Sequence, residues 1–127
     1  MKKIFVLFAI LMLSAIRTNT VKAITFEEAF SQSKPIAVLI YADWADDYLE
    51  TLKAFDEIEP QYSNKYNFVR LNIADKDTKV FNKTFHIYPG LPYVLLFKDR
   101  GRISRYLKKD CVLDSSCIGD KLHVFGN

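Results

Sequence analysis

The chain has 127 residues, of which 50% are hydrophobic and 26% charged, so its composition is that of a folded globular protein and not of a disordered one. The formal net charge is +3, but four basic residues and no acidic ones lie in the first 23 positions. The rest of the chain carries 14 basic and 15 acidic residues. This balance gives no overall electrostatic attraction for nucleic acid, and we expect none as a partner.

The first 23 residues have the pattern of a secretory signal. Met1-Lys2-Lys3 precede an apolar run from Ile4 to Ile16, which is shorter than the ~20 residues that span a bilayer. Val21-Lys22-Ala23 then places compact residues where a signal peptidase requires them. We expect a signal peptide over residues 1–23 and an exported protein, periplasmic or secreted. An uncleaved membrane anchor is the alternative.

Residues 24–127 are enough for one domain with a buried core, and its elements can be taken in chain order. Thr25 can cap a short helix over 26–32. The unbroken apolar run 36–41 indicates a strand that is buried on both faces. A helix over 46–59 follows, because apolar residues recur there at helical spacing.

The second half of the domain alternates in the same way. The expected elements are a strand at 67–73, a helix at 78–85, strands at 93–97 and 103–107, and a last helix capped by Asp114 or Ser115. The first β-α-β unit requires a right-handed crossover between parallel strands, and the last two strands form a hairpin. The sequence therefore predicts an α/β domain with a four-stranded mixed sheet and helices on both faces.

Cys111 and Cys117 are the two cysteines of the chain. An even number of cysteines in an exported protein indicates a disulfide. A bond across this short loop stabilises the fold by roughly 2.4 kcal/mol in the chain-entropy picture.

Five segments, in this order and spacing, resemble the thioredoxin superfamily. Tyr41-Ala42-Asp43-Trp44 resembles the strand end and tryptophan that precede the family's Cys-x-x-Cys. The other four segments are Asp56-Glu57-Ile58, Arg70-Leu71-Asn72-Ile73, Gly90-Leu91-Pro92 and the hairpin from Leu95 to Gly101. The resemblance covers nearly all of residues 25–125 and implies a thioredoxin-like fold.

The chain departs from this family at the reactive positions. Where the family has Cys-x-x-Cys, this sequence has Ala45-Asp46-Asp47-Tyr48. Thiol–disulfide exchange requires a thiolate, which neither Ala45 nor the phenol of Tyr48 supplies. Leu39 also stands where many thioredoxins carry a buried acid. We therefore expect no catalytic residue and no cofactor, and the family's activity is not carried over.

The resemblance also implies a surface for peptides. Trp44, Tyr48, Leu91 and Pro92 match the family's peptide-contact positions, with a cis bond before Pro92. Backbone groups next to such a proline can pair with an extended peptide. The sequence thus predicts a non-catalytic protein-binding or peptide-binding, scaffold or chaperone-like module whose partner it does not identify. A purely structural role of Trp44 and Pro92 is the alternative.

Two rival functions rest on other residues. Cys111 and Cys117 would make an atypical thiol–disulfide oxidoreductase if they were a displaced redox pair. We favour a structural bond, because five residues separate them instead of two. A basic hairpin could make this an envelope-surface protein that binds an anionic partner or lipid. Its residues are Lys98, Arg100, Arg102, Arg105, Lys108 and Lys109.

Two further groups of charges need an interpretation. Asp46 and Asp47 could bind a metal, but no histidine lies near them in the sequence. We expect no metal site, and expect both carboxylates to satisfy free amides at a helix N-terminus. Arg70 lies in a strand expected to be largely buried, so it needs an acidic partner that the sequence does not identify.

Overall fold

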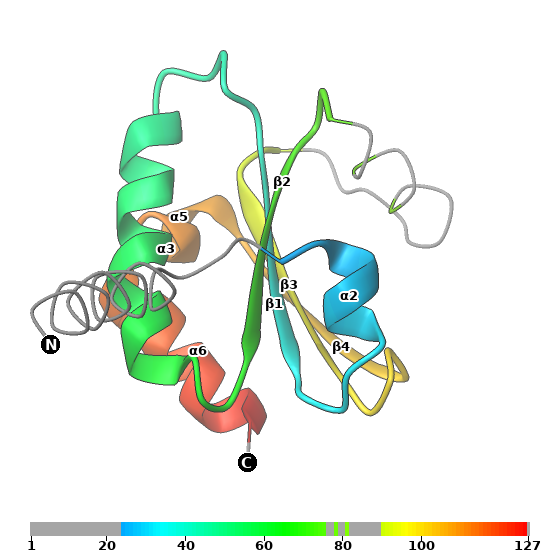
Figure 1. Ribbon diagram of the computed structural model, residues 1–127. Helices are drawn as coiled ribbons and strands as arrows, with labels where there is room; N and C mark the ends of the chain where they lie inside the picture. The colour runs from blue at the N-terminus through cyan, green and yellow to red at the C-terminus, as the bar shows by residue number, and fades with distance from the viewer. Residues whose placement is uncertain (1–23, 76–77, 79–80, 82–89, 127) are drawn as a thin grey trace, which may run out of the picture.

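The structure, a computed structural model, describes residues 24–75, 78, 81 and 90–126. It contains one sheet of four strands with helices on both faces (Figure 1). The strands are β1 (Ile36–Tyr41), β2 (Asn67–Asn72), β3 (Tyr93–Lys98) and β4 (Ile103–Leu107). The helices are α2 (Phe26–Phe30), α3 (Tyr48–Tyr62), α5 (Lys109–Val112) and α6 (Ser115–Gly126). The expected signal peptide at 1–23 lies outside the described residues.

The sheet has the order β2-β1-β3-β4. β1 runs parallel to β2 and antiparallel to β3, and β3 is antiparallel to β4. The expected mixed sheet and its final hairpin are therefore confirmed. The expected helix at 78–85 lies mostly outside the described residues, although Thr78 and Phe81 are helical.

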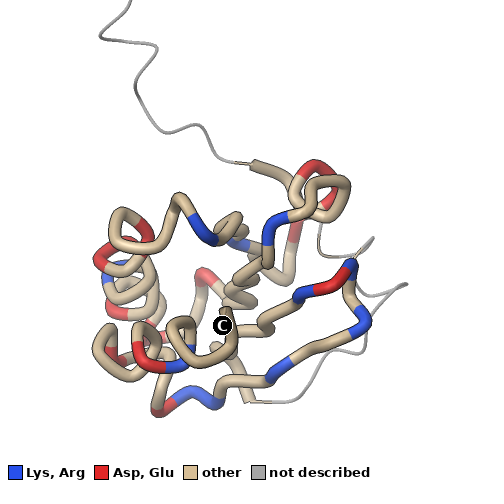
Figure 2. Tube along the Cα trace, turned by 90° about the horizontal axis from the view of Figure 1, so that it is seen from below, with Lys and Arg blue, Asp and Glu red and all other residues tan. Residues whose placement is uncertain are grey.

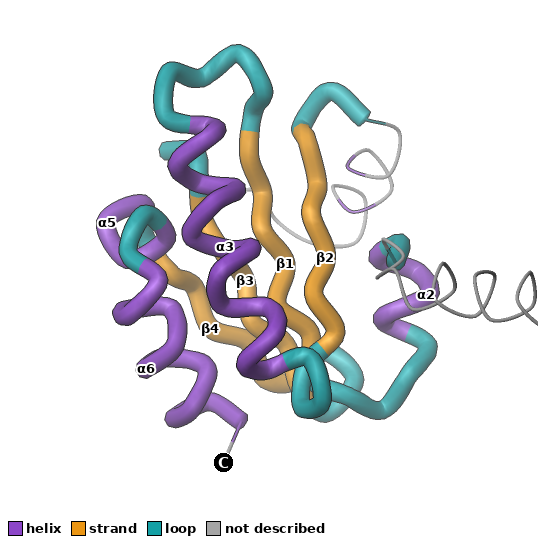
Figure 3. Tube along the Cα trace, turned by 60° about the vertical axis from the view of Figure 1, so that its left-hand side comes forward, coloured by secondary structure: helices purple, strands orange, loops and turns teal. Residues whose placement is uncertain are grey.

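Strand β1 explains the unbroken apolar run, because its two faces belong to two different cores. Ala37 and Leu39 pack toward α3 and α6, whereas Val38 and Ile40 pack toward α2. All four side chains are fully buried. Figure 3 shows α3 and α6 on one face of the sheet and α2 on the other. A strand covered on both faces has no need of polar alternation.

Helix α3 differs from the expected span at both ends. It begins at Tyr48, two residues late, because 42–48 form turns in which Ala45 and Tyr48 each donate to a carbonyl three residues earlier. It also runs beyond the expected end at 59, through Pro60 to Tyr62. The last turn is held against α6 by a hydrogen bond, because the Tyr62 hydroxyl donates to the Gly119 carbonyl at 3.1 Å.

The chain between β4 and α6 contains a helix that the sequence did not predict. α5 is one turn long and is anchored by the fully buried Val112. The carboxylate of Asp114 then accepts a hydrogen bond from the Ser116 amide at 3.0 Å. Of the two candidate caps for α6, this contact supports Asp114.

Arg70 on β2 has the acidic partners that its position requires. Its guanidinium contacts carboxylate oxygens of Asp56 and Glu59, both at 2.6 Å. It also lies 4.8 Å from the centre of the Phe55 ring. All three partners come from α3, so this cation ties the helix to the edge strand of the sheet.

Tyr66 joins α6 to the core through a hydrogen bond. Its ring is almost fully buried and its hydroxyl donates to the Leu122 carbonyl at 2.6 Å. Burial, and to a smaller extent the neighbouring Tyr62, raise the pKa of this phenol to about 12. An unfolded tyrosine ionises near 10, so above that pH proton release favours the unfolded chain.

We predict that Tyr66→Phe lowers the free energy of unfolding by about 1 kcal/mol at neutral pH, through loss of this hydrogen bond. Wild type should lose additional stability as the pH rises from 10 toward 12, and the variant should lose less, because it lacks the suppressed phenol. Urea unfolding at neutral and alkaline pH measures both effects. Identical alkaline losses in the two proteins would contradict the assignment.

Candidate binding site

The predicted site residues gather where β1 ends and β3 begins. The antiparallel pairing ends with Ile40 opposite Tyr93, so the residues that follow β1 and the Leu91-Pro92 segment that precedes β3 leave the sheet at the same edge. β2 ends at the same edge, because Tyr41 is paired with Asn72. The Asn72 side-chain amide donates to Asp43 at 2.9 Å and orders the chain that leads to Trp44. One edge of the sheet thus carries the whole site.

The site presents apolar side chains to solvent. Trp44 is 65% exposed and Leu49, in the first turn of α3, is 66% exposed. Tyr48 and Leu91 are half-buried, and Pro92 is buried. The bond between Leu91 and Pro92 is cis, as the resemblance implied. No backbone hydrogen bond joins Leu91 to another of the described residues.

Asp47 does not play the expected role. It is the N-cap residue of α3, but its side chain accepts no hydrogen bond from the helix amides. The carboxylate instead contacts the Lys109 ammonium of α5 at 2.9 Å. The hydrogen bond to Asp47, and then the charge of Asp47, raise the pKa of Lys109. The expectation that both carboxylates satisfy helix amides is therefore wrong for Asp47, because a lysine lies within reach.

The other carboxylates make this edge anionic. Asp43, Asp46 and Asp75 are exposed. The pKa of Tyr41 is raised, first by burial and then by the charges of Asp75 and Asp43, while Arg70 opposes the shift. Tyr41 therefore stays a neutral phenol beside the acids. Within the described ranges, no three metal-binding side chains are grouped so that they could hold an ion.

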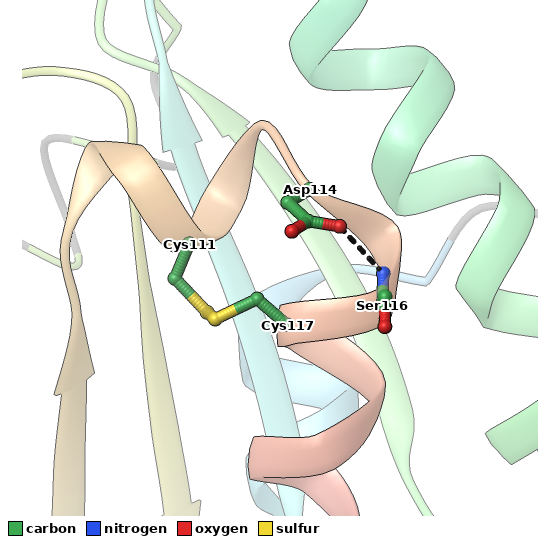
Figure 4. Close-up of a disulfide and its surroundings, with 4 residues drawn as sticks. All are labelled: Cys111, Asp114, Ser116 and Cys117. Carbon is green, nitrogen blue, oxygen red and sulfur yellow. Dashed lines mark hydrogen bonds between the residues drawn. A yellow bond between two sulfur atoms is a disulfide. The ribbon is translucent and has the colours of Figure 1, made fainter.

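The disulfide joins α5 to the first turn of α6 (Figure 4). Cys111 and Cys117 are bonded with a Cα–Cα distance of 5.2 Å, and both are half-buried. Cys111 lies two residues after Lys109, whose ammonium reaches Asp47 at the start of α3. This ion pair brings the α5 segment, with its disulfide, next to the candidate binding site.

Several basic side chains of the hairpin already have contacts within the protein, so fewer of them are available to bind an anionic partner than the sequence suggested. Lys109 belongs to α5 and pairs with Asp47. The Lys98 ammonium donates to the Phe125 carbonyl at 2.8 Å and lies 4.8 Å from the centre of the Phe125 ring. Arg102 lies 3.7 Å from Asp99 in an exposed pair. Arg100, Arg105 and Lys108 make no ion pair with any described residue.

Two contacts at this site were not predicted from the sequence. The pair of Asp47 and Lys109 depends on an unpredicted helix, and no local pattern links the two positions. The hydrogen bond between Asn72 and Asp43 had a weak signal in the sequence. Asn72 ends β2 and Asp43 follows the end of β1, and these two strands are buried and parallel. Carboxyl ends of parallel strands meet at one edge, so polar residues there are expected to be close.

No family model matches the chain. It is 41% identical over 86 residues to the thioredoxin-like protein HCF164, chloroplastic, of Arabidopsis thaliana, a region covering 68% of this chain and 32% of that protein. The protein of the same name from Oryza sativa subsp. japonica is 30% identical over 97 residues, covering 73% of this chain and 37% of its own length. The chain thus spans about a third of the length of these curated relatives.

Solved thioredoxins have the same fold. Chloroplastic thioredoxin z superposes with a TM-score of 0.62 at 16% identity, covering 82% of this chain and 92% of that one. Mitochondrial thioredoxin 3 of Saccharomyces cerevisiae also gives 0.62, at 13% identity, covering 83% and 95%. Deadhead of Drosophila melanogaster gives 0.62 at 11% identity, covering 83% and 98%. At these identities the likeness concerns the fold.

The sheet order, the helices on both faces and these similarities define a thioredoxin-like protein. The chain belongs to the thioredoxin superfamily, as its five segments indicated. Among the residues that the structure describes, none of the helices has the length and apolar character needed to cross a bilayer.

Trp44 is the one tryptophan of the sequence and therefore reports on this site alone. We predict that the ratio of the caesium to the iodide quenching constant is higher for Trp44 than for free N-acetyltryptophanamide, because Trp44 is exposed beside Asp43 and Asp46. The free amide is the reference because iodide is intrinsically the stronger quencher of indole. Asp46→Asn should lower this ratio. Asp120→Asn, an exposed change on α6, should leave it unchanged. A wild-type ratio equal to that of the free amide would show that the acids do not set the field at Trp44.

Proposed function

We propose that this protein is an exported thioredoxin-fold binding module that does not exchange disulfides at the start of α3. The observation that carries the proposal is an exposed Trp44 followed by four residues without a thiol. By resemblance, Ala45 and Tyr48 replace the two reactive cysteines of the family.

The chemistry of α3 supports the absence of exchange at this position. A mixed disulfide needs a sulfur nucleophile, and the residues that precede and open α3 offer carboxylates and a phenol. Asp47, nearest the helix, is compensated by Lys109. Both cysteines of the chain are bonded to each other instead of lying at this site.

The same edge is suited to an extended peptide segment of a partner protein. Trp44 and Leu49 offer exposed apolar area, and large aromatic side chains dominate binding energies at interfaces. Leu91 lies just before the start of β3, and its backbone makes no hydrogen bond to another of the described residues. An extended peptide could pair with this backbone while its side chains cover the tryptophan.

Peptide binding is tested with an array of immobilised, unstructured peptides of varied sequence, probed with the labelled protein. Peptides that bind should lose roughly tenfold in affinity with Trp44→Ala, as expected for a central aromatic contact. His123→Ala removes an exposed ring-bearing side chain from α6, away from the residues that line the proposed site, and serves as the control. An array without bound peptides, or one that Trp44→Ala binds as well as wild type, would reject the proposal.

A second candidate function is suggested by the disulfide itself. Cys111 and Cys117 are half-buried and connected to the start of α3 through Lys109. A thiol–disulfide oxidoreductase that uses this pair would work beside the usual site of the family. The two functions differ in whether the bond is reduced and reformed during turnover.

We predict no turnover in a disulfide-reduction assay with a dithiol as the electron donor. Replacing both cysteines by serine should lower the free energy of unfolding by roughly 2 kcal/mol, because the cross-link no longer restricts the unfolded chain. Catalytic reduction that is abolished by Cys111→Ser would make the protein an oxidoreductase with a displaced site. Trp44→Ala is the control, since it changes the binding edge and neither cysteine.

A further inference from the structure

Strand β4 forms an edge of the sheet that faces a groove. Among the described strands it pairs only with β3, so part of its backbone points away from the sheet. Ile103, Arg105 and Leu107 are every second residue of the strand, so their side chains lie on the same face. Leu107 packs in the same core as Leu122 of α6, so this face is turned toward α6.

Side chains from β4 and α6 line the groove. It includes a cavity of about 240 Å³ between Arg105, Tyr106 and Leu107 of β4 and Lys121, Val124 and Phe125 of α6. A second cavity, of about 420 Å³, shares Tyr106, Leu107 and Lys121 and extends to Lys108, the disulfide and the acidic residues Asp110 and Asp114, so the cationic part of the groove is the first cavity. Val124 is 70% exposed and Ile103 is 45% exposed, so the groove also offers apolar surface.

The first cavity is cationic. Arg105 and Lys121 contribute positive charge to its lining, and no acidic side chain does so. Both are exposed, and neither makes an ion pair with any residue that the structure describes. Lys98 and Lys109, in contrast, are engaged by Phe125 and Asp47. Figure 2 shows that basic positions recur along the hairpin of β3 and β4.

We propose that this groove, defined by Arg105, Leu107, Lys121 and Val124, binds an acidic peptide segment that adds to β4 as a fifth strand. The edge of β4 that no described strand pairs with favours an extended backbone as the ligand. The two cations specify carboxylates on the side of the added strand that faces α6. Val124 specifies a short apolar side chain next to them.

A peptide fits these features better than a lipid surface does. The cations lie on two different elements and line a hollow, whereas a membrane requires cations on a protruding or flat face. The backbone groups at the edge of β4 can also pair with the regularly spaced amides of a peptide, and lipid head groups have no such series of amides. The cavity between Arg105 and Lys121 shares no residue with the edge that carries Trp44, so this proposal does not depend on the proposed function.

The test uses the full chain and a fluorescein-labelled peptide that alternates glutamate and valine, followed by fluorescence polarisation. A peptide with lysine in place of glutamate, and one with proline at alternate positions, are the matched probes. The glutamate peptide should bind, and both other probes should bind at least roughly tenfold more weakly, because the first has the wrong charge and the second cannot pair its backbone.

Variants of the protein locate the contact. The double change Arg105→Glu and Lys121→Glu should weaken binding roughly tenfold or more, and Arg105→Gln with Lys121→Gln should weaken it less. Lys53→Glu, an exposed charge reversal on α3, should leave the affinity unchanged. Hydrogen exchange at the amides of β4 should slow when the glutamate peptide is bound, because a paired strand protects them.

Three results would overturn the proposal. One is equal affinity of the double charge reversal and the wild-type protein. Another is unchanged exchange at β4 with the peptide bound, which would mean that the contact is ionic and adds no strand. The last is binding to phosphatidylglycerol vesicles without binding to the glutamate peptide, which would assign the cations to a lipid surface.

Discussion

The hydrogen bonding of β1 on both of its edges is the constraint on which the rest of the structure depends. The strand is covered on both faces, so its backbone groups are out of reach of water and must pair with neighbouring strands. The neighbours are β2 on one side and β3 on the other. Because β2 is parallel and β3 antiparallel, the end of β1, the end of β2 and the start of β3 meet. The segments that carry Trp44, Asp43 and Leu91 leave the sheet at the same edge for this reason.

Charge pairs connect the elements around this sheet. Arg70 on β2 contacts Asp56 and Glu59 near the end of α3, and Lys109 on α5 contacts Asp47 at its beginning. Both pairs are partly exposed, so each contributes little stability by itself. Their effect is on position: one helix is fixed at both ends, and the residues before it are presented to solvent beside α5.

The fold could be predicted because its signals were long and mutually consistent. The apolar run of β1, the apolar stripe of α3 and the Gly90-Leu91-Pro92 loop each agreed with the same architecture. α5 could not be predicted, since a single turn with one buried valine has no periodicity to detect. The start of α3 was misplaced because Asp46 and Asp47 are good residues for a first turn, yet the chain uses Ala45 and Tyr48 to close turns before the helix.

The candidate site was predicted in part for the same reason. Trp44 and Leu91 were placed by resemblance, and the register of β1 and β3 brings the segments that carry them to one edge of the sheet. The partner of Asp47 could not be predicted, because Lys109 follows it by some 60 positions and is positioned by α5. The groove beside β4 was hidden as well. The hairpin was predicted as one basic surface, but Lys98 binds the end of α6, and Lys121 completes the cationic cavity from another element.

The middle position of β1 also sets the order in which the domain can be completed as it is synthesised. One edge of β1 can pair as soon as β2 exists, but the other pairs with a strand whose last contact joins Ile36 to Phe97. Until that distant segment has been made, a fully apolar strand is left with half of its backbone unpaired. Contacts so far apart in sequence form slowly. The chain therefore cannot close its core from the N-terminus onward, and it remains open until most of the domain has emerged from the ribosome.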